Sequence, residues 1–116
     1  MNRNSRLTQS TDFKRVRRFG KSYAHPLVVL VVLAGADEQK RIGVMAGRSV
    51  GNAVQRNRAK RMLREAVRTI LPKLKLNWDV VLIARYPILN AKLSDLEDCL
   101  IQLFSKANLI SDNNER

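Results

Sequence analysis

Basic side chains spaced four residues apart are the groups in this sequence best placed to do chemistry, and that chemistry is phosphate binding. Arg56, Lys60, Arg64 and Arg68 recur at a spacing that puts them along one side of a helix. Arginine holds a phosphate through two parallel hydrogen bonds. Residues four apart on a helix rise by about 6 Å, close to the spacing of backbone phosphates. The pattern therefore predicts a helix that binds a polyanion.

Acids that could neutralise this segment are almost absent. Residues 41–68 carry eight basic side chains and a single acid, Glu65. A merely solvated charged surface is the alternative interpretation, but an unpaired cluster of this kind costs stability unless a polyanion binds it. The predicted contacts on this helix, which opens at Gly51-Asn52, are Arg56, Asn57, Arg58, Lys60, Arg61, Arg64 and Arg68.

A second basic block lies near the N-terminus and contains aromatic residues. Its members are Lys14, Arg15, Arg17, Arg18 and Lys21, with Phe13, Phe19 and Tyr23 between or beside them. Cations mixed with aromatic rings suit unpaired RNA, because bases stack on rings while phosphates meet cations. For Phe13 core packing is an equal alternative, and both interpretations hold if the ring lines a groove between a helix and a sheet.

Groups that could carry catalysis are scarce. The chain has one histidine, His25, whereas acid–base cleavage of RNA by a protein usually needs two positioned titrating groups. No tight set of carboxylates suggests a metal site. We expect His25 to be a strand-edge or core residue, Cys99 a small buried residue, and Trp78 a packing residue. The sequence predicts no catalytic residue, metal site or firmly bound cofactor in the protein.

Composition narrows the class further. The 116 residues carry a formal net charge of +12, and 45% are hydrophobic, which suits one small folded domain. The single cysteine excludes an internal disulfide and fits a reducing, cytoplasmic compartment. The longest apolar run, residues 26–36, is too short to span a bilayer, and the polar N-terminus does not resemble a secretory signal. We expect one domain over 1–116, with flexible ends at about 1–6 and 110–116.

The first half of the chain predicts a helix followed by strands. Thr8 or Ser10 can cap a helix that ends at Gly20. Residues 21–25 form a short extended piece, and the apolar runs 27–34 and 41–47 predict an antiparallel hairpin.

The second half predicts helix, strand and helix. Asn52 and Gln55 form a capping box for the basic helix, which Pro72 ends. Its apolar side is Ala59, Met62, Leu63, Ala66, Val67, Ile70 and Leu71. Residues 79–85 form a buried strand parallel to 41–47. A second capping box at 94–97 opens a helix with the apolar side Leu93, Leu96, Leu100, Leu103, Phe104 and Ala107. The class is α+β or α/β, with helices packed on a small sheet.

These residues together resemble the bacterial ribonuclease P protein subunit. The resemblance rests on Arg41-Ile42-Gly43-Val44, Val50-Gly51-Asn52-Ala53-Val54, and the stretch from Arg56-Asn57-Arg58 to Ala66. Further matches are Arg6-Leu7, Asp12-Phe13, Val16, Gly20, the run 79–85 and Leu103-Phe104. They cover roughly residues 5–107, and their combination is highly specific.

The resemblance implies a ribonucleoprotein endonuclease that removes the 5′ leader from precursor tRNA. A large RNA subunit would carry the active site and its magnesium ions, while the protein binds that RNA and the leader. The implied fold is α+β, an αβββαβα two-layer sandwich with a four-stranded sheet. Its strand-helix-strand crossover would be left-handed, whereas the general rule favours a right-handed one.

The resemblance also implies two RNA contacts in this chain. One is the basic helix with its preceding loop, which adds Arg48 and Asn52 to the residues given above. The other is a leader-binding cleft with Phe13, Arg17 and Val31. Relatives often have aromatic residues where this chain has Arg17 and Val31, and often have Ser-Lys-Lys where it has Gly47-Arg48-Ser49. Leader recognition here is therefore expected to depend less on stacking and more on charge.

The expected partners are the catalytic RNA and precursor tRNA, with no membrane and no obligate protein partner. A ribosomal or assembly protein would share the basic charge and small size but not this set of motifs. A DNA-binding helix-turn-helix module would place its basic helix after another helix, whereas here it follows a strand.

Overall fold

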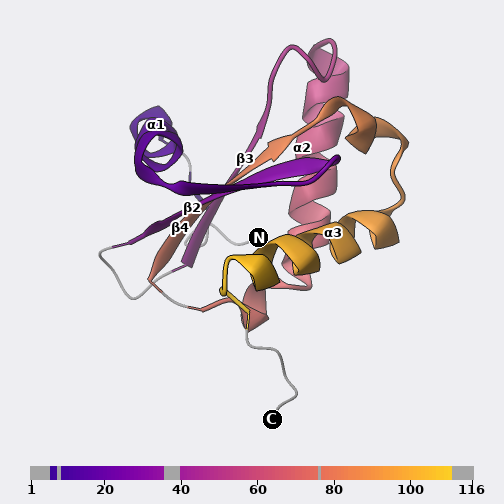
Figure 1. Ribbon diagram of the computed structural model, residues 1–116. Coiled ribbons are helices and arrows are strands. Elements are labelled where there is room, and N and C mark those ends of the chain that lie inside the picture. The colour runs from indigo at the N-terminus through magenta and orange to yellow at the C-terminus, as the bar shows by residue number, and fades with distance from the viewer. Residues whose placement is uncertain (1–5, 8, 36–39, 76, 111–116) are drawn as a thin grey trace.

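The computed structural model describes residues 6–7, 9–35, 40–75 and 77–110. Its elements are α1 (Ser10–Phe19), β1 (Lys21–Ala24), β2 (Val28–Ala34), β3 (Lys40–Ala46), α2 (Ala53–Arg68), β4 (Trp78–Ala84) and α3 (Leu93–Lys106). Short 3-10 helices, η2 (Leu71–Lys73) and η3 (Tyr86–Asn90), flank β4. Figure 1 shows the predicted order αβββαβα around one sheet, which confirms the α+β class.

The four strands pair in the order β1-β2-β4-β3. β3 runs parallel to β4, as predicted, and β2 is antiparallel to both β1 and β4. The predicted hairpin between β2 and β3 is wrong, because β4 lies between them. β4 is apolar over most of its length, and this central place buries both of its faces and pairs it along its whole length. The hand of the β3-α2-β4 crossover stays a prediction.

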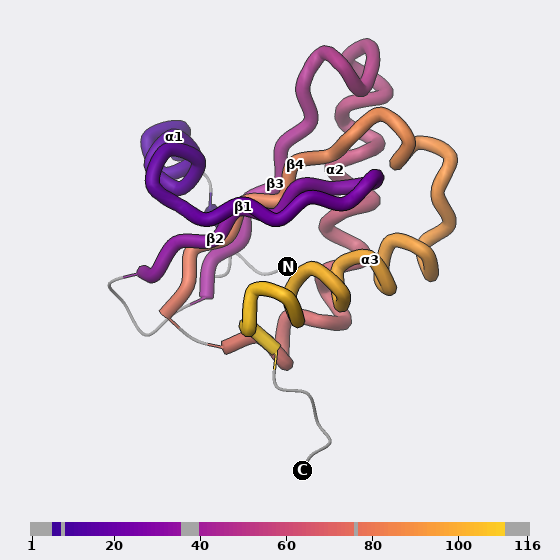
Figure 2. The backbone as a smooth tube through the Cα atoms, in the orientation of Figure 1, coloured from indigo at the N-terminus to yellow at the C-terminus, as the bar shows by residue number. Residues whose placement is uncertain are grey.

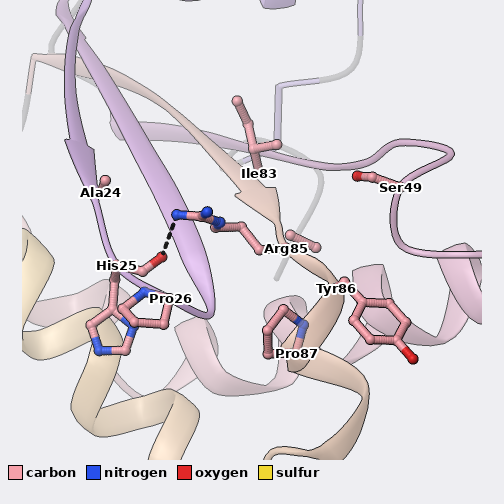
Figure 3. A pocket seen from close by; sticks show the side chains of 9 residues that line it. Ala24, His25, Pro26, Ser49, Ile83, Arg85, Tyr86 and Pro87 are labelled. Atoms are coloured by element: carbon pink, nitrogen blue, oxygen red, sulfur yellow. Dashed lines mark hydrogen bonds between the residues drawn. The ribbon is translucent and has the colours of Figure 1, made fainter.

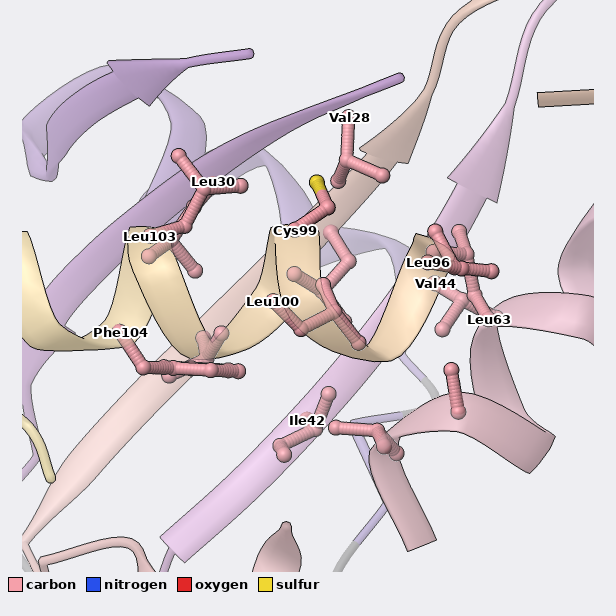
Figure 4. Close-up of a cluster of buried hydrophobic side chains, with 14 of the residues drawn as sticks. Val28, Leu30, Ile42, Val44, Leu63, Leu96, Cys99, Leu100, Leu103 and Phe104 are labelled. Atoms are coloured by element: carbon pink, nitrogen blue, oxygen red, sulfur yellow. The ribbon is translucent and has the colours of Figure 1, made fainter. Parts of the chain in front are cut away.

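Helices cover both faces of the sheet. Alternate strand residues such as Leu30, Ile42 and Leu82 enter a main core beneath α2 and α3 (Figure 4). The intervening residues Val31 and Val81 belong to a second core beneath α1. Figure 2 shows α1 on the face of the sheet opposite to α2 and α3. The predicted two-layer arrangement therefore needs an addition, since α1 forms a partial third layer over β2 and β4.

The predicted capping box fixes the start of α2. The Asn52 side chain accepts a hydrogen bond from the Gln55 backbone at 2.9 Å, and the Gln55 side chain accepts one from the Asn52 backbone at 2.8 Å. Gly51 directly before it has φ 145°, a conformation that a residue with a side chain rarely adopts. The helix ends at Arg68, before Pro72, which lies in the first turn of the 3-10 helix η2.

The ends of the other two helices differ from the prediction. α1 begins at Ser10 after Gln9, without a side-chain cap, and Thr8 lies outside the described residues. α3 begins at Leu93 after Lys92, so Ser94 already has a helical backbone and the predicted second capping box does not form. A cap needs an extended backbone at the capping residue, and at the start of α3 this residue is Lys92, whose side chain makes no capping hydrogen bond.

Gly20 ends α1, as predicted, but for a reason of space. Its backbone is extended rather than left-handed. A Cβ at this position would lie 2.7 Å from the Val32 carbonyl oxygen and 2.8 Å from a Val31 methyl group. The glycine lets the chain turn from α1 into β1 directly against β2.

Most of the two ends predicted to be flexible lies outside the described residues. Within the described part, Arg6 forms an isolated bridge to Ile42, and Ile110 forms one to Leu74. No helix in the described ranges is long and apolar enough to cross a membrane.

Candidate nucleic-acid interface

The basic residues of α2 lie on its solvent side, because its buried residues Ala59, Leu63, Ala66 and Val67 face the sheet. The exposed predicted residues on this side are Asn57, Arg58, Arg61 and Arg68, preceded by Arg48 in the turn after β3. Arg56, Lys60 and Arg64 form a half-buried flank beside them. Asn52 is exposed, but its side chain is occupied by the capping box. We call the eight predicted residues other than Asn52 the α2 basic surface.

Few internal partners neutralise this surface. Within the described ranges, the one ion pair on α2 joins Arg68 to Glu65 at 2.7 Å, and it is exposed. Arg56 donates a hydrogen bond to the Gly51 carbonyl oxygen at 3.1 Å, which closes the first turn of the helix. An exposed pair of this kind contributes little stability. Since it involves only Arg68, most of the positive charge of the α2 basic surface is available to a ligand.

Arg64 has the least favourable environment of these arginines. Its Nε atom is buried and has no hydrogen-bond partner among the described residues. Burial lowers the pKa of Arg64, and the nearby charge of Arg6 lowers it further. A buried, unpartnered donor beside a second cation is costly unless an anion joins them.

A hollow of about 400 Å³ separates α1 from β3 and the flank of α2. It is lined by Ser10, Phe13, Lys14, Arg17, Val44, Met45, Ala46 and Lys60, and we call it the α1 hollow. Phe13 lies over Gly43, where an added Cβ would overlap the ring. The ring therefore packs on the sheet and also lines the hollow, which is the arrangement that allows both interpretations, and its contact with RNA stays a prediction.

The predicted leader-binding residues do not all meet in this hollow. Phe13 and Arg17 line it together. Val31 is 2% exposed and packs beneath α1 with Val16 and Val81. Its side chain faces α1, as a cleft residue would, but helix packing covers it, so it lies outside the α1 hollow.

A second, larger hollow of about 620 Å³ lies where β4 ends (Figure 3). It is lined by Ala24, His25, Pro26, Ser49, Ile83, Ala84, Arg85, Tyr86 and Pro87, and we call it the sheet-end hollow. Arg85 donates a hydrogen bond to the His25 carbonyl oxygen at 3.3 Å, and Tyr86 is 60% exposed. Sequence reasoning missed this site, although a cation followed by an aromatic residue at a strand end could have suggested it.

His25 itself matches the strand-edge prediction. It follows β1 and is half-buried, and its Nδ1 accepts a hydrogen bond from the Leu27 backbone at 3.1 Å. This contact holds the turn between β1 and β2. The imidazole is therefore engaged locally.

A buried carboxylate was also missed. Asp79 opens the apolar run of β4, is 2% exposed, and accepts hydrogen bonds from two arginines. The distances are 2.6 Å from Arg15 on α1, and 3.0 Å from both Nε and Nη2 of Arg41 on β3. Burial alone would raise the pKa of Asp79, but the hydrogen bonds from Arg41 and Arg15 outweigh it and hold the pKa below its ordinary value. An acid at the start of an otherwise apolar strand was the available signal.

No other chemistry-bearing cluster stands out in the described ranges. No three histidine, cysteine or acidic side chains there gather as metal ligands. Cys99 is buried in the main core beneath α3, as predicted, and burial raises the pKa of its thiol to about 11. Trp78 packs against the same core, which agrees with its predicted packing role.

Comparisons with known proteins agree with one another. The family model described as Ribonuclease P matches residues 1–108. A "Ribonuclease P protein component" of Herpetosiphon aurantiacus is 36% identical over 99% of this chain and 94% of its own length. One of Dehalococcoides mccartyi is 38% identical over 100% of this chain and 95% of its own length.

A solved structure gives the same result for the fold. The RNase P protein of Staphylococcus aureus superposes with a TM-score of 0.80, at 26% identity, over 92% of this chain and 98% of that one. The motifs, the sheet order and the basic helix thus agree with one assignment, and the chain belongs to the ribonuclease P protein family.

Proposed function

We propose that this chain contacts two RNAs through adjacent surfaces, the catalytic RNA through the α2 basic surface and the precursor leader through the α1 hollow. As a ribonuclease P protein component, it is the protein subunit of a holoenzyme that acts in tRNA 5′ processing. The proposal concerns how its residues divide that work.

The position of Lys60 carries this proposal. Lys60 lies on the half-buried flank of α2 and also lines the α1 hollow. The two sites are therefore one continuous cationic surface rather than two separate patches. A large RNA held on α2 would bring the 5′ end of a bound precursor tRNA close to the hollow.

The composition of the α1 hollow favours a single-stranded leader. Phe13 offers one aromatic surface, and Lys14, Arg17 and Lys60 supply three cations around it. Unpaired nucleotides present both a base that can stack and a phosphate that needs a cation. Because the lining has one aromatic residue and several cations, we expect the leader to be held mainly by charge.

The sheet-end hollow could extend this surface. Ser49 lines it from the loop that joins β3 to α2, one residue after Arg48. Exposed Tyr86 and neighbouring Arg85 provide a ring and a cation there (Figure 3). An RNA chain leaving the α2 basic surface at Arg48 would meet this hollow next.

We assign the chemical step to the RNA subunit. The protein's one histidine is engaged in a local turn, and its most deeply buried acid is paired with two arginines. The proposal therefore places the magnesium ions in the RNA subunit and no catalytic residue in the protein. It also places the holoenzyme in the cytoplasm, because that is where a chain with one unpaired cysteine and a tRNA-processing role would work.

The α2 contact is tested by its salt dependence. Each of Arg58→Ala and Arg61→Ala should weaken binding to the catalytic RNA and lower the slope of log Kd against log salt by about one unit. Lys106→Ala, at the far end of α3, removes the same charge and should leave the slope unchanged. Equal slopes for all three variants would show that the α2 arginines are only solvated surface.

A further inference from the structure

We propose that Asp79 is a positioning residue for the α1 hollow, because it holds α1 against the sheet through Arg15 and so fixes the helix wall that carries Phe13 and Arg17. This inference rests on the proposed function, in which that hollow receives the leader. Asp79 itself is too deeply buried to touch RNA.

The ion pairs join three elements at one point. Asp79 is the second residue of β4, and its register partner on β3 is Arg41, which donates two hydrogen bonds to the same carboxylate. Arg15 reaches that carboxylate from α1 at 2.6 Å and also contacts Asp12 on its own helix at 3.3 Å. Two strands and a helix are therefore linked through one buried side chain.

This contact lies on the side of α1 away from the hollow. Phe13 and Val16 rest on the sheet, Arg15 projects toward Asp79 along one flank, and Lys14 and Arg17 line the hollow along the other. In the described ranges, the bond from Arg15 to Asp79 is the one side-chain hydrogen bond between α1 and the sheet. Figures 1 and 2 show that α1 is the one helix on its face of the sheet, whereas α2 and α3 lie on the other face.

Apolar packing alone would not set the position of α1. The small core beneath it consists of Leu7, Val16, Val31 and Val81, with Phe13 at its edge. Such contacts have no preferred direction, so they constrain the rotation of a helix less sharply than a directed polar contact does. A short, charge-assisted hydrogen bond has a fixed geometry, and the bond from Arg15 to Asp79 therefore fixes how far α1 stands from β4.

A purely stabilising role explains the cluster less well. Removing a carboxylate from water is costly, and a buried ion pair often adds no more stability than an apolar residue would. An apolar side chain would have completed β4 as a continuous apolar strand. The ion pair adds a defined place for α1, which apolar packing could not supply.

Charge alone and positioning predict opposite results for Asp79→Asn. The substitution removes a negative charge from a basic protein, so charge alone would tighten the binding of any RNA. Loss of positioning would instead weaken only the interaction that uses the α1 hollow. The leader-dependent part of the affinity therefore distinguishes the two explanations.

The experiment uses the holoenzyme reconstituted with its catalytic RNA. The affinity of the holoenzyme is measured for precursor tRNA and for the same tRNA without its leader. The ratio of the first affinity to the second gives the contribution of the leader to binding. We expect Asp79→Asn to lower that ratio by roughly fivefold, while affinity for the catalytic RNA does not weaken. Hydrogen exchange should quicken in α1 and stay unchanged in α2. Asp98→Asn, the same substitution on the exposed side of α3, should alter neither measurement.

Parallel variants separate the possible failures. If Arg17→Ala leaves the ratio unchanged, the proposed leader contact is wrong and this inference fails with it. If Arg17→Ala lowers the ratio and Asp79→Asn does not, the inference alone is overturned. Should Asp79→Asn not fold, Arg15→Met carries the test with Arg18→Met as the matched loss of charge. If hydrogen exchange in α1 is faster for Arg15→Met but not for Arg18→Met, the positioning role is supported. If the two variants exchange equally fast in α1, the positioning role is overturned.

Discussion

At the scale of single residues, the basic side chains of this protein fall into two groups, those paired within the fold and those available to RNA. Asp79 neutralises Arg15 and Arg41 within the fold, so these two arginines serve structure. On α2 the described acids neutralise only Arg68, and Arg64 keeps an unpartnered Nε. The number of basic residues in the sequence therefore overestimates the positive charge available to RNA near α1. On α2 the same count is a good measure of the available charge.

The pairing of Asp79 predicts how stability depends on pH. Its pKa in the folded state lies below the ordinary value of 3.8, so its contribution is complete above that value and is lost as pH falls through the lowered pKa. Asp79→Asn should destabilise the protein at pH 7 by about 2 kcal/mol, less than a fully buried pair because both guanidiniums reach solvent.

Urea unfolding followed by the fluorescence of Trp78, the single tryptophan, measures this effect. The difference between the two proteins should shrink as pH falls from about 4 toward 2. A difference that stays constant over that range would show that the charge of Asp79 contributes nothing.

At the scale of elements, sequence patterns predicted the features that depend on interactions between residues close together in the chain. The capping box, the apolar side of α2, and the runs that became β2, β3 and β4 all follow from neighbours in the sequence. The pairing of β2 with β4 did not follow, because it joins segments about 50 residues apart, and a hairpin between β2 and β3 is the shorter connection. The patterns also predicted the order of the elements, and the resemblance added the four-stranded sheet and the left-handed crossover.

The functional site was predictable to a similar extent. The basic side of α2 follows from helical spacing, and the hollow shared by Phe13 and Arg17 agrees with the cleft that the resemblance implied. Burial of Val31 and the pairing of Asp79 depend on how α1 lies across the sheet, which no local pattern contains. The sheet-end hollow likewise forms only where loops from three parts of the chain meet.

The start of α2 offers a test at this scale. Asn52→Ala removes the side chain that accepts the Gln55 amide and should lower the free energy of unfolding by about 1 kcal/mol. Asn57→Ala makes the same substitution at an exposed site inside the same helix and should be neutral or slightly stabilising, because alanine favours helix. Equal destabilisation by both would mean that the capping box is not formed in solution.

At the scale of the whole molecule, the α2 basic surface and the α1 hollow lie beside β3, and the acidic helix α3 lies over other strands. α2 packs over β3 and β4, the α1 hollow opens beside β3, and α3 covers β1 and β2. The exposed acids Asp95 and Asp98 are on α3. The electrostatic field of these charges would attract an approaching RNA to the β3 side of the protein, where the α2 basic surface and the α1 hollow meet at Lys60.

The central claim is that the protein positions RNAs while the RNA subunit cuts. The most direct measurement is cleavage of precursor tRNA at low magnesium by the purified protein, by the catalytic RNA, and by both together. We expect no cleavage by the protein alone, little by the RNA alone, and efficient release of a mature 5′ end by the mixture. Cleavage by ribonuclease-free protein alone, or a mixture no faster than the RNA, would contradict the account.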